Sequence, residues 1–372
     1  MNLRVLVVDD TVLFRTVVSE ALKKIPGVDV IGSAASGRAA LAKVAELKPD
    51  LITLDIEMPG MDGLQVLDEL KKMGSDAGVI IVSSVTVKGG SYTIRALERG
   101  AFDFITKPSE GNAEQNRIAV YDALAPRVKA FARKREISTI LSGKILSKTI
   151  PAEESSAKTP HAKGVSQEKK VDSRIQLQKL EMLLIGVSTG GPAALAALLP
   201  ALPANLGVPV VIVQHMPPMF TNALANSLSA KCQLKVCEAS NGDMLESDTV
   251  YIAPGGKQLK LGAPNSSGAK SLFVTDDPPE NNCKPSVDYL FRSAASNYPG
   301  KSMAIILTGM GSDGTLGLRL LKRHGCYVIA QDEQSCVVYG MPRSAVDAGV
   351  VDCIMPLHDI AGKIVNIMRK GL

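Results

Sequence analysis

Residues 182–192 read MLLIGVSTGGP, and this stretch sets the organisation of the second half of the chain. An apolar run ends at Ser188, two glycines follow, and an alanine- and leucine-rich run begins after Pro192. This order predicts a buried strand, a tight turn and a helix. A serine at such a turn exposes its hydroxyl beside the N–H groups of the helix N-terminus, which can stabilise an oxyanion. We therefore expect Ser188 to be a nucleophile.

The alternation of apolar strands and amphipathic helices continues through residues 179–372. It predicts a second doubly wound, Rossmann-like α/β domain. Strands are expected at 182–186, 208–213, 249–252, 271–274, 303–307 and 327–330. Helices are expected at 193–199, 221–229, 286–296, 314–324 and 343–348.

The chain has four histidines, and their positions favour one of them as the general base that Ser188 requires. His215 follows the apolar strand 208–213, so it lies at a strand's carboxyl end, as Ser188 does. A polar residue satisfied at the start of a loop is the alternative interpretation for His215. The other three lie in a polar stretch, at a predicted helix end and near the C-terminus: His161, His324 and His358.

A carboxylate that can orient His215 lies in the glycine-rich turn 308–314, TGMGSDG, after a predicted strand. Asp313 precedes a predicted helix, so an ordinary N-cap is the alternative for it. The glycines could also form a phosphate loop, but no P-loop lysine follows and G-x-G-x-x-G is not satisfied. Residues 186–190 match G-x-S-x-G, yet α/β-hydrolases place the acid before the histidine. We expect hydrolase-like chemistry on a different topology.

Residues 1–135 predict a first domain, a flavodoxin-like, doubly wound parallel sheet. Strands are expected at 3–8, 28–34, 51–54, 79–82 and 102–106. The polar residues at the carboxyl ends of these strands are Asp9, Asp10, Asp55, Ser83 and Lys107. Three carboxylates at one sheet edge would repel one another unless a cation lay among them, and Mg²⁺ prefers oxygen ligands. The nearby lysine and hydroxyl would suit a phosphoryl group on one carboxylate. Lys107–Pro108 is a candidate cis peptide.

Composition separates the two domains and excludes several classes of protein. Residues 136–178 are rich in Ser, Lys, Thr, Glu and Pro and predict a flexible linker. The basic run 127–148 reads as a solvated helix end, with a nucleic-acid patch as the alternative. The net charge of +5, the 4% aromatic content and the absence of Trp favour no nucleic-acid partner.

The remaining compositional signals concern metals and membranes. The six cysteines contain no C-x-x-C pair, which argues against a zinc site. We expect no signal peptide, because the apolar run 5–8 stops at Asp9 and Asp10. Gly and Pro residues interrupt the uncharged segment 182–214, which argues against a membrane span. We therefore expect a cytoplasmic protein without membrane insertion.

The first domain resembles the two-component receiver family. The motifs that carry the resemblance are VVDD at 7–10, LDIEMPGMDG at 54–63, VSS at 82–84 and TKP at 106–108. The roles that it implies are phosphorylation of Asp55, magnesium binding by Asp9, Asp10, Asp55 and the backbone carbonyl of Glu57, and switching by Ser83, Phe104 and Lys107. Phe104 stands where the family usually has a tyrosine, so the hydroxyl of that switch residue is missing.

The second domain resembles the chemotaxis methylesterase catalytic domain. The motifs are IGVSTGGP at 185–192, VQHMP at 213–217, YIAPGG at 251–256, PSVD at 285–288, LTGMGSDG at 307–314 and YGMP at 339–342. With the receiver in front, the chain is similar to the chemotaxis response regulator protein-glutamate methylesterase (CheB) family. The resemblance implies a triad of Ser188, His215 and Asp313. Our candidates for holding the oxyanion are backbone N–H groups of Thr189, Gly190, Gly191 and Met310.

This resemblance also implies a substrate, partners and regulation. The substrate is a glutamate methyl ester on the cytoplasmic helices of chemoreceptors, with methanol as a product, and family members also deamidate receptor glutamines. A chemotaxis histidine kinase is the expected phosphodonor, and the esterase step needs no cofactor. We expect the unphosphorylated receiver to pack over the Ser188 crevice, and phosphorylation of Asp55 to open it.

Two other kinds of output domain are possible alternatives. DNA-binding outputs are usually small helical or winged modules, whereas this region has nearly two hundred residues of α/β pattern. A dinucleotide-binding domain would need the middle glycine of its fingerprint, which is absent after the strand 182–186. Neither alternative explains a serine, a histidine and an aspartate at three strand ends.

Overall fold

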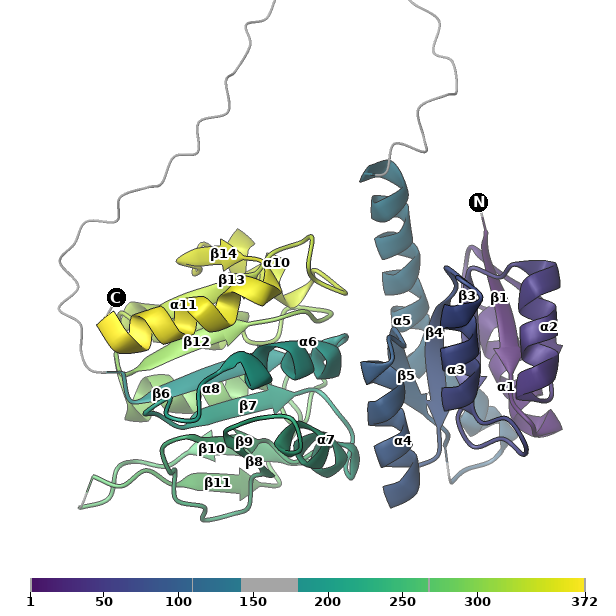
Figure 1. Ribbon diagram of the computed structural model, residues 1–372. Helices are drawn as coiled ribbons and strands as arrows, with labels where there is room; N and C mark the ends of the chain where they lie inside the picture. Colours follow the sequence, from purple (N-terminus) through teal and green to yellow (C-terminus); the bar gives the residue numbers. More distant parts are fainter. Residues whose placement is uncertain (1, 109, 142–179, 267, 371–372) are drawn as a thin grey trace, which may run out of the picture.

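The computed structural model describes residues 2–108, 110–141, 180–266 and 268–370, which form two α/β domains (Figure 1). The N-terminal sheet is parallel, with strand order β2-β1-β3-β4-β5. Its strands are β1 (Leu3–Val8), β2 (Val28–Ala34), β3 (Leu51–Asp55), β4 (Gly78–Ser83) and β5 (Asp103–Thr106). Its helices are α1 (Val12–Lys23), α2 (Gly37–Leu47), α3 (Gly63–Lys72), α4 (Val87–Glu98) and α5 (Ala113–Leu141). The predicted doubly wound sheet is confirmed.

The last helix of this domain runs further than the sequence pattern indicated. α5 continues to Leu141, past the start of the predicted linker at residue 136. The rest of that linker, residues 142–178, lies outside the described residues, as does His161. The cis peptide bond within the described part of the chain is Lys284–Pro285, so the prediction of a cis Lys107–Pro108 bond is wrong.

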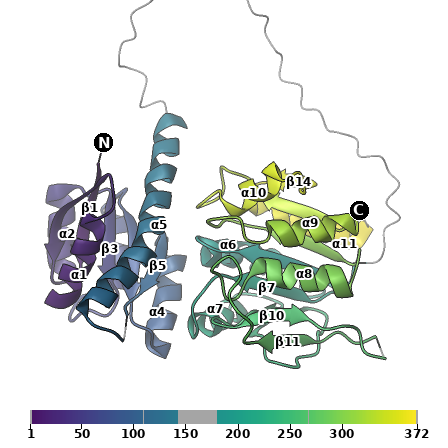
Figure 2. The ribbon, with the colours of Figure 1, turned by 180° about the vertical axis from the view of Figure 1, so that it is seen from behind.

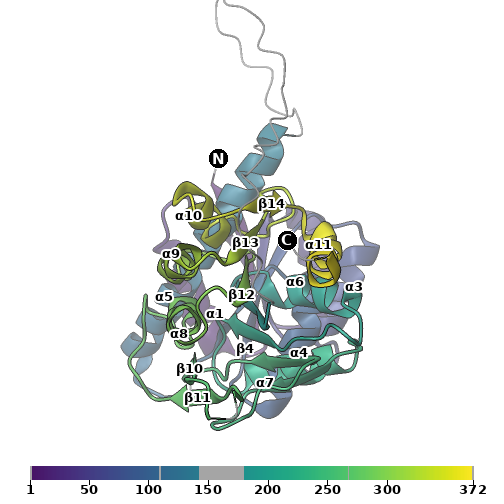
Figure 3. The same cartoon turned by 90° about the vertical axis from the view of Figure 1, so that its left-hand side faces the viewer.

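The C-terminal domain has a seven-stranded parallel sheet with strand order β14-β13-β12-β6-β7-β9-β8. Its strands are β6 (Met182–Val187), β7 (Val210–Gln214), β8 (Lys235–Glu238), β9 (Thr249–Ile252), β12 (Ser302–Ile306), β13 (Tyr327–Gln331) and β14 (Cys353–Met355). Its helices are α6 (Gly191–Leu198), the 3-10 helix η1 (Leu199–Ala201), α7 (Phe220–Ser229), α8 (Val287–Asn297), α9 (Thr315–Arg323), α10 (Met341–Asp347) and α11 (Leu357–Lys370). Helices α8, α9 and α10 cover one face and α6, α7 and α11 the other (Figure 3).

The order of these strands places a site at the carboxyl ends of the central strands. The chain leaves β6 toward β7 on one side, whereas β12 pairs with β6 on the other side. The loops that follow β6 and β12 therefore run in opposite directions from the carboxyl ends of these two strands. Doubly wound folds bind ligands in the crevice between such loops. Ser188, His215 and the 308–314 turn all follow strands that meet there.

Several elements, most of them short strands, were not predicted or were assigned to the wrong place. The strand expected at 271–274 is β11 (Leu272–Thr275), which pairs antiparallel with β10 (Gln258–Leu261) in a separate ribbon. β8, β10, β14 and α11 have no counterpart among the predicted elements. Strands of three or four residues at a sheet edge or in a ribbon contain too few residues to show a periodicity.

The two domains pack directly on one another. α4 of the first domain lies against α7 of the second, and α5 also faces the second domain (Figures 1 and 2). One cluster of buried apolar side chains runs through both domains and includes Phe104 and Phe220. No helix among the described residues is long and apolar enough to cross a membrane.

Candidate active site

Ser188 lies directly after β6, in a turn fixed by hydrogen bonds to both neighbouring strand ends and to the start of α6. Its N–H donates to the carbonyl of Thr308 (3.0 Å), and its carbonyl accepts from Gly191 N–H (2.8 Å). The carbonyl also accepts from the buried side-chain amide of Gln214 (3.0 Å). Gly190 has a φ of 78°, a left-handed conformation that glycine adopts without strain. The backbone of this turn is therefore held from both neighbouring strands.

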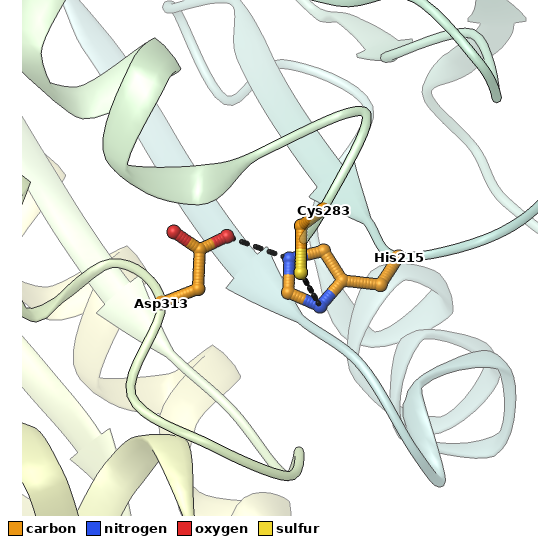
Figure 4. Close-up of side chains that lie close together, drawn as sticks. All are labelled: His215, Cys283 and Asp313. Carbon is orange, nitrogen blue, oxygen red and sulfur yellow. Dashed lines mark hydrogen bonds and ion pairs between the residues drawn. The ribbon is translucent and has the colours of Figure 1, made fainter. Parts of the chain in front are cut away.

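His215 follows the neighbouring strand at the same level as Ser188. Val187 pairs with Gln214 in the sheet register, and His215 N–H donates to Val187 carbonyl (3.1 Å). The imidazole Nε2 lies 2.7 Å from Oδ2 of Asp313, and the Asp313 side chain is 3% exposed (Figure 4). The structure thus brings His215 and Asp313, 98 residues apart, into contact.

Asp313 is held by many donors besides His215. Its Oδ2 accepts from Val287 N–H (2.7 Å), and its Oδ1 accepts from the Ser286 hydroxyl (2.9 Å) and Asp288 N–H (3.0 Å). Oδ1 also accepts from the side chain of Asn281 (3.2 Å) and from Gly314 N–H (3.0 Å). So many donors hold a buried carboxylate in one position and stabilise its ionised form.

Burial and pairing act in opposite directions on the pKa values of this pair. Burial raises the pKa of Asp313, but the hydrogen bond and charge of His215 and the Val287 and Asp288 amides lower it to about 2. Burial lowers the pKa of His215, but Asp313 and the Cys283 sulfur raise it to about 9. The pair therefore favours an imidazolium beside a carboxylate.

The amides around Ser188 differ in whether they are already used. Among the described residues, the N–H groups of Thr189, Gly190 and Met310 donate no hydrogen bond, whereas Gly191 N–H donates to Ser188. Met310 follows Gly309, whose backbone approaches Ser188 so closely that a Cβ added there would lie 2.7 Å from Ser188 Cβ. Three of the four candidate oxyanion donors therefore have no acceptor among the described residues.

The Ser188 hydroxyl makes no hydrogen bond to any residue that the structure describes. Nδ1 of His215, the ring nitrogen away from Asp313, instead lies 3.7 Å from Sγ of Cys283 (Figure 4). Hydrogen bonds between nucleophile and base are often made only when substrate is bound. His324 caps the C-terminus of α9, and His358 is 79% exposed, so neither competes for the role of base.

The predicted acidic cluster is assembled in the N-terminal domain. Carboxylate oxygens of Asp9, Asp10 and Asp55 lie within 4.8 Å of one another. Nζ of Lys107 lies 2.7 Å from Asp9 and 2.8 Å from Asp55. Burial raises the pKa of Asp55 to about 6, with the charge of Asp9 acting in the same direction and Lys107 against it. Glu57 N–H donates to Asp55 (3.3 Å).

Negative charge is thus in excess at this cluster, and its oxygen donors are those that a hard divalent cation prefers. Ser83, at the end of β4, is buried and donates to the carbonyls of Ser84 and Gly89 (both 3.4 Å). The residues present therefore fit a magnesium ion.

Comparisons with known proteins identify both domains. The CheB methylesterase family model matches residues 183–364, and the response regulator receiver domain model matches residues 5–119. A protein-glutamate methylesterase/protein-glutamine glutaminase of Desulfotalea psychrophila is 48% identical over 368 residues, 99% of each chain. The chain belongs to the CheB methylesterase family.

Further relatives extend the comparison. A protein of Bacillus subtilis with the same name is 41% identical over 373 residues, again 99% of each chain. The CheB methylesterase catalytic domain of Thermotoga maritima is 42% identical and covers 50% of this chain and 98% of its own, with a TM-score of 0.49.

In this CheB family member the receiver contacts the turn that carries Ser188. The hydroxyl of Thr189 donates to Oδ2 of Asp103 in β5 (2.9 Å), and both residues are buried. Arg127 of α5 pairs with the same carboxylate oxygen (3.1 Å). The next residue of β5, Phe104, stacks on Phe220 of α7 with ring centroids 4.9 Å apart. The predicted switch aromatic therefore lies at the domain interface.

A second part of the interface lies beside the 308–314 turn. A cavity of about 310 Å³ separates α5 from the second domain. Its lining includes Arg133 and Lys134 from the receiver and Met310 and Tyr339 from the catalytic domain. The receiver therefore faces both turns that carry candidate oxyanion donors.

Sequence reasoning missed several residues around the His–Asp pair. Asn281, Cys283 and Ser286 lie in a loop without periodicity before α8, and Gln214 was read only as part of a motif. Asp288, on α8, is buried, and burial raises its pKa to about 6. The PSVD motif at 285–288 was the available signal, since its serine and aspartate had no assigned role.

Proposed function

We propose that this chain is a phosphorylation-regulated protein-glutamate methylesterase in which Ser188, His215 and Asp313 form the catalytic triad. The observation that carries the proposal is the 2.7 Å contact of His215 with buried Asp313, beside a serine at the paired strand end. The substrate is a glutamate methyl ester on a chemoreceptor, and receptor glutamines are a second substrate. We place the reaction in the cytoplasm, where the receptor's signalling helices lie.

The triad acts by acyl transfer. Because Nε2 of His215 faces Asp313, Nδ1 is the nitrogen that takes the proton as Ser188 Oγ attacks the ester carbonyl. The same nitrogen then protonates the leaving methoxide, which departs as methanol. Water, deprotonated by His215, attacks the acyl-enzyme and releases the glutamate carboxylate and Ser188. Asp313 orients the imidazole and stabilises its charged form.

The developing oxyanion is held by backbone amides. Thr189, Gly190 and Met310 supply N–H groups that have no other acceptor among the described residues. Gly191 supports this turn through its bond to the Ser188 carbonyl. Stabilisation of the oxyanion therefore uses backbone N–H groups of this chain.

The receiver is phosphorylated on Asp55 by a chemotaxis histidine kinase. Asp55 attacks the phosphorus of the kinase phosphohistidine, the P–N bond breaks and the kinase imidazole leaves, so that Asp55 carries the phosphoryl group. Lys107 pairs with the oxygens of that group. Mg²⁺, held by Asp9, Asp10, Asp55 and the carbonyl of Glu57, would neutralise charge on the carboxylates and the phosphoryl oxygens. Ser83 supplies the hydroxyl that contacts the phosphoryl group.

The closed arrangement of the domains restricts access to Ser188. The Thr189–Asp103 hydrogen bond and the Phe104–Phe220 stack are contacts that a receiver rearrangement would break. Phosphorylation favours an arrangement in which these contacts are absent and receptor can reach the serine.

The test is methanol release from membranes that carry radiolabelled, methylated receptors. Ser188→Ala should abolish release in both the resting state and the phosphodonor-treated state, while the protein keeps its wild-type melting temperature. Methanol release by a folded Ser188→Ala protein would exclude Ser188 as the nucleophile.

A further inference from the structure

Cys283 and His215 form a contact that the esterase reaction does not use. Sγ of Cys283 lies 3.7 Å from Nδ1 of His215, and the two residues are 68 positions apart. All six cysteines are free, and Cys283 is half-buried rather than enclosed in a core. The His215 side chain is 14% exposed, so an aqueous ion can reach both groups.

The separation of these two atoms fits a thiophilic metal ion. A tetrahedral zinc ion has Zn–N of about 2.05 Å and Zn–S of about 2.3 Å, which places the two donors about 3.6 Å apart. The observed separation of 3.7 Å therefore needs almost no adjustment. The loop that presents the sulfur is fixed, since the Cys283 carbonyl accepts from the Gln258 side chain (3.3 Å) and Cys283 pairs with Glu280 in a β-bridge.

The rest of the His215 environment also suits a metal ligand. A histidine that binds a metal through one nitrogen usually donates its other N–H to a carboxylate, which fixes the ring and raises its basicity. Asp313 already makes this bond with Nε2 at 2.7 Å. Its two oxygens are used by other donors, so Asp313 orients the ligand rather than binding the ion.

We propose that Cys283 and His215 form an inhibitory binding site for Zn²⁺ and similar thiophilic divalent cations, completed by water. On binding, the thiol and Nδ1 of the imidazolium each release a proton to solvent, and the thiolate and Nδ1 then donate electron pairs to the metal. Nδ1 can then no longer accept the Ser188 proton. Cysteine spacing in the sequence gives no sign of this site because the two ligands come from separate segments.

Only the inhibitory effect rests on the proposed role of His215 as the base; the metal binding does not. The two parts are measured separately on the full-length, unphosphorylated protein. Binding is followed with Co²⁺ by its thiolate-to-metal charge-transfer absorption, which oxygen ligands of the receiver cannot produce. Inhibition is followed by methanol release with and without Zn²⁺, as a ratio for each variant.

The absorption should appear in the wild type, in Ser188→Ala and in the matched control Cys232→Ser, a second half-buried cysteine. It should be absent from Cys283→Ser. Zn²⁺ at ten times its dissociation constant should lower wild-type activity about elevenfold, since the metal-free fraction of the protein is 1/(1 + [L]/Kd). The activity ratio of Cys283→Ser should stay near one.

Three results would overturn the proposal in whole or in part. Absence of the absorption from the wild type, or its persistence in Cys283→Ser, would exclude the site. Absorption without inhibition would exclude the inhibitory role. Activity of Ser188→Ala would contradict the triad and leave the cobalt result unaffected.

Discussion

The hydrogen bond between Thr189 and Asp103 gives the sharpest test of how the receiver restrains the esterase. Thr189→Val removes the hydroxyl that donates to the Asp103 carboxylate at 2.9 Å and keeps the shape of the side chain and its backbone N–H. The variant should weaken the closed arrangement without altering Ser188. Thr189→Ser keeps the hydroxyl and is the matched control.

The size of the effect follows from the environment of the carboxylate. A hydrogen bond to a charged acceptor contributes about 1.5–3 kcal/mol. Each 1.4 kcal/mol corresponds to about a tenfold change in a population ratio. Arg127 remains paired with Asp103 at 3.1 Å, so the carboxylate is not left alone in the closed arrangement. We therefore expect the hydrogen bond to contribute an amount at the lower end of this range of free energies. Its loss should shift the population ratio about tenfold toward the open arrangement.

The assay is methanol release by the unphosphorylated protein, divided by release at a saturating concentration of a small phosphodonor. This ratio corrects for any change in the intrinsic rate of the active site. Thr189→Val should raise the ratio by up to about tenfold, with full stimulation as the upper limit, and Thr189→Ser should match the wild type. An unchanged ratio in Thr189→Val would show that this hydrogen bond does not hold the domains closed.

Three further variants test the remaining assignments. Asp55→Asn should abolish stimulation by phosphodonor and keep resting methanol release; retained stimulation would place the phosphorylation elsewhere. Because His215 must be neutral to act as a base and its pKa is raised to about 9, wild-type kcat/KM should rise with pH until about that value. Asp313→Asn should move this rise to lower pH and reduce kcat on the order of 10⁴-fold; a profile that stays at the wild-type position would exclude the ion pair as its cause. Gly309→Ala puts a Cβ 2.7 Å from Ser188 Cβ and should lower methanol release by about 10²-fold in a protein that still folds, as judged by circular dichroism; wild-type release would show that the serine tolerates displacement.

The three candidate catalytic residues were found from the sequence because each follows an apolar strand. Parallel strands that end at one edge of a sheet bring such residues together whatever the loops between them do. The same rule located Asp9, Asp10, Asp55 and Lys107.

What the sequence could not show depends on the path of a loop. Cys283 and Asn281 reach the His–Asp pair from a segment without periodicity. Their positions are set by long-range hydrogen bonds such as those of Gln258, which have no local sequence pattern. The contact between Asp103 and Thr189 joins two domains and depends on how they dock, which neither domain's own pattern determines.

One strand of the receiver can connect the proposed phosphorylation site to the serine. Asp103 and Phe104 of β5 contact the second domain, and Lys107, three residues beyond Phe104, lies between Asp9 and Asp55. The hydrogen bond contributes about 1.5–3 kcal/mol and the aromatic stack about 0.5–1.5 kcal/mol.

A phosphoryl group on Asp55, the proposed phosphorylation site, would form charge-assisted hydrogen bonds of about this total strength, including bonds with Lys107. A ligand shifts a two-state equilibrium only by its differential free energy for the two states. The hydrogen bond and the aromatic stack beside Ser188 together contribute only a few kcal/mol, which the bonds of one phosphoryl group can offset.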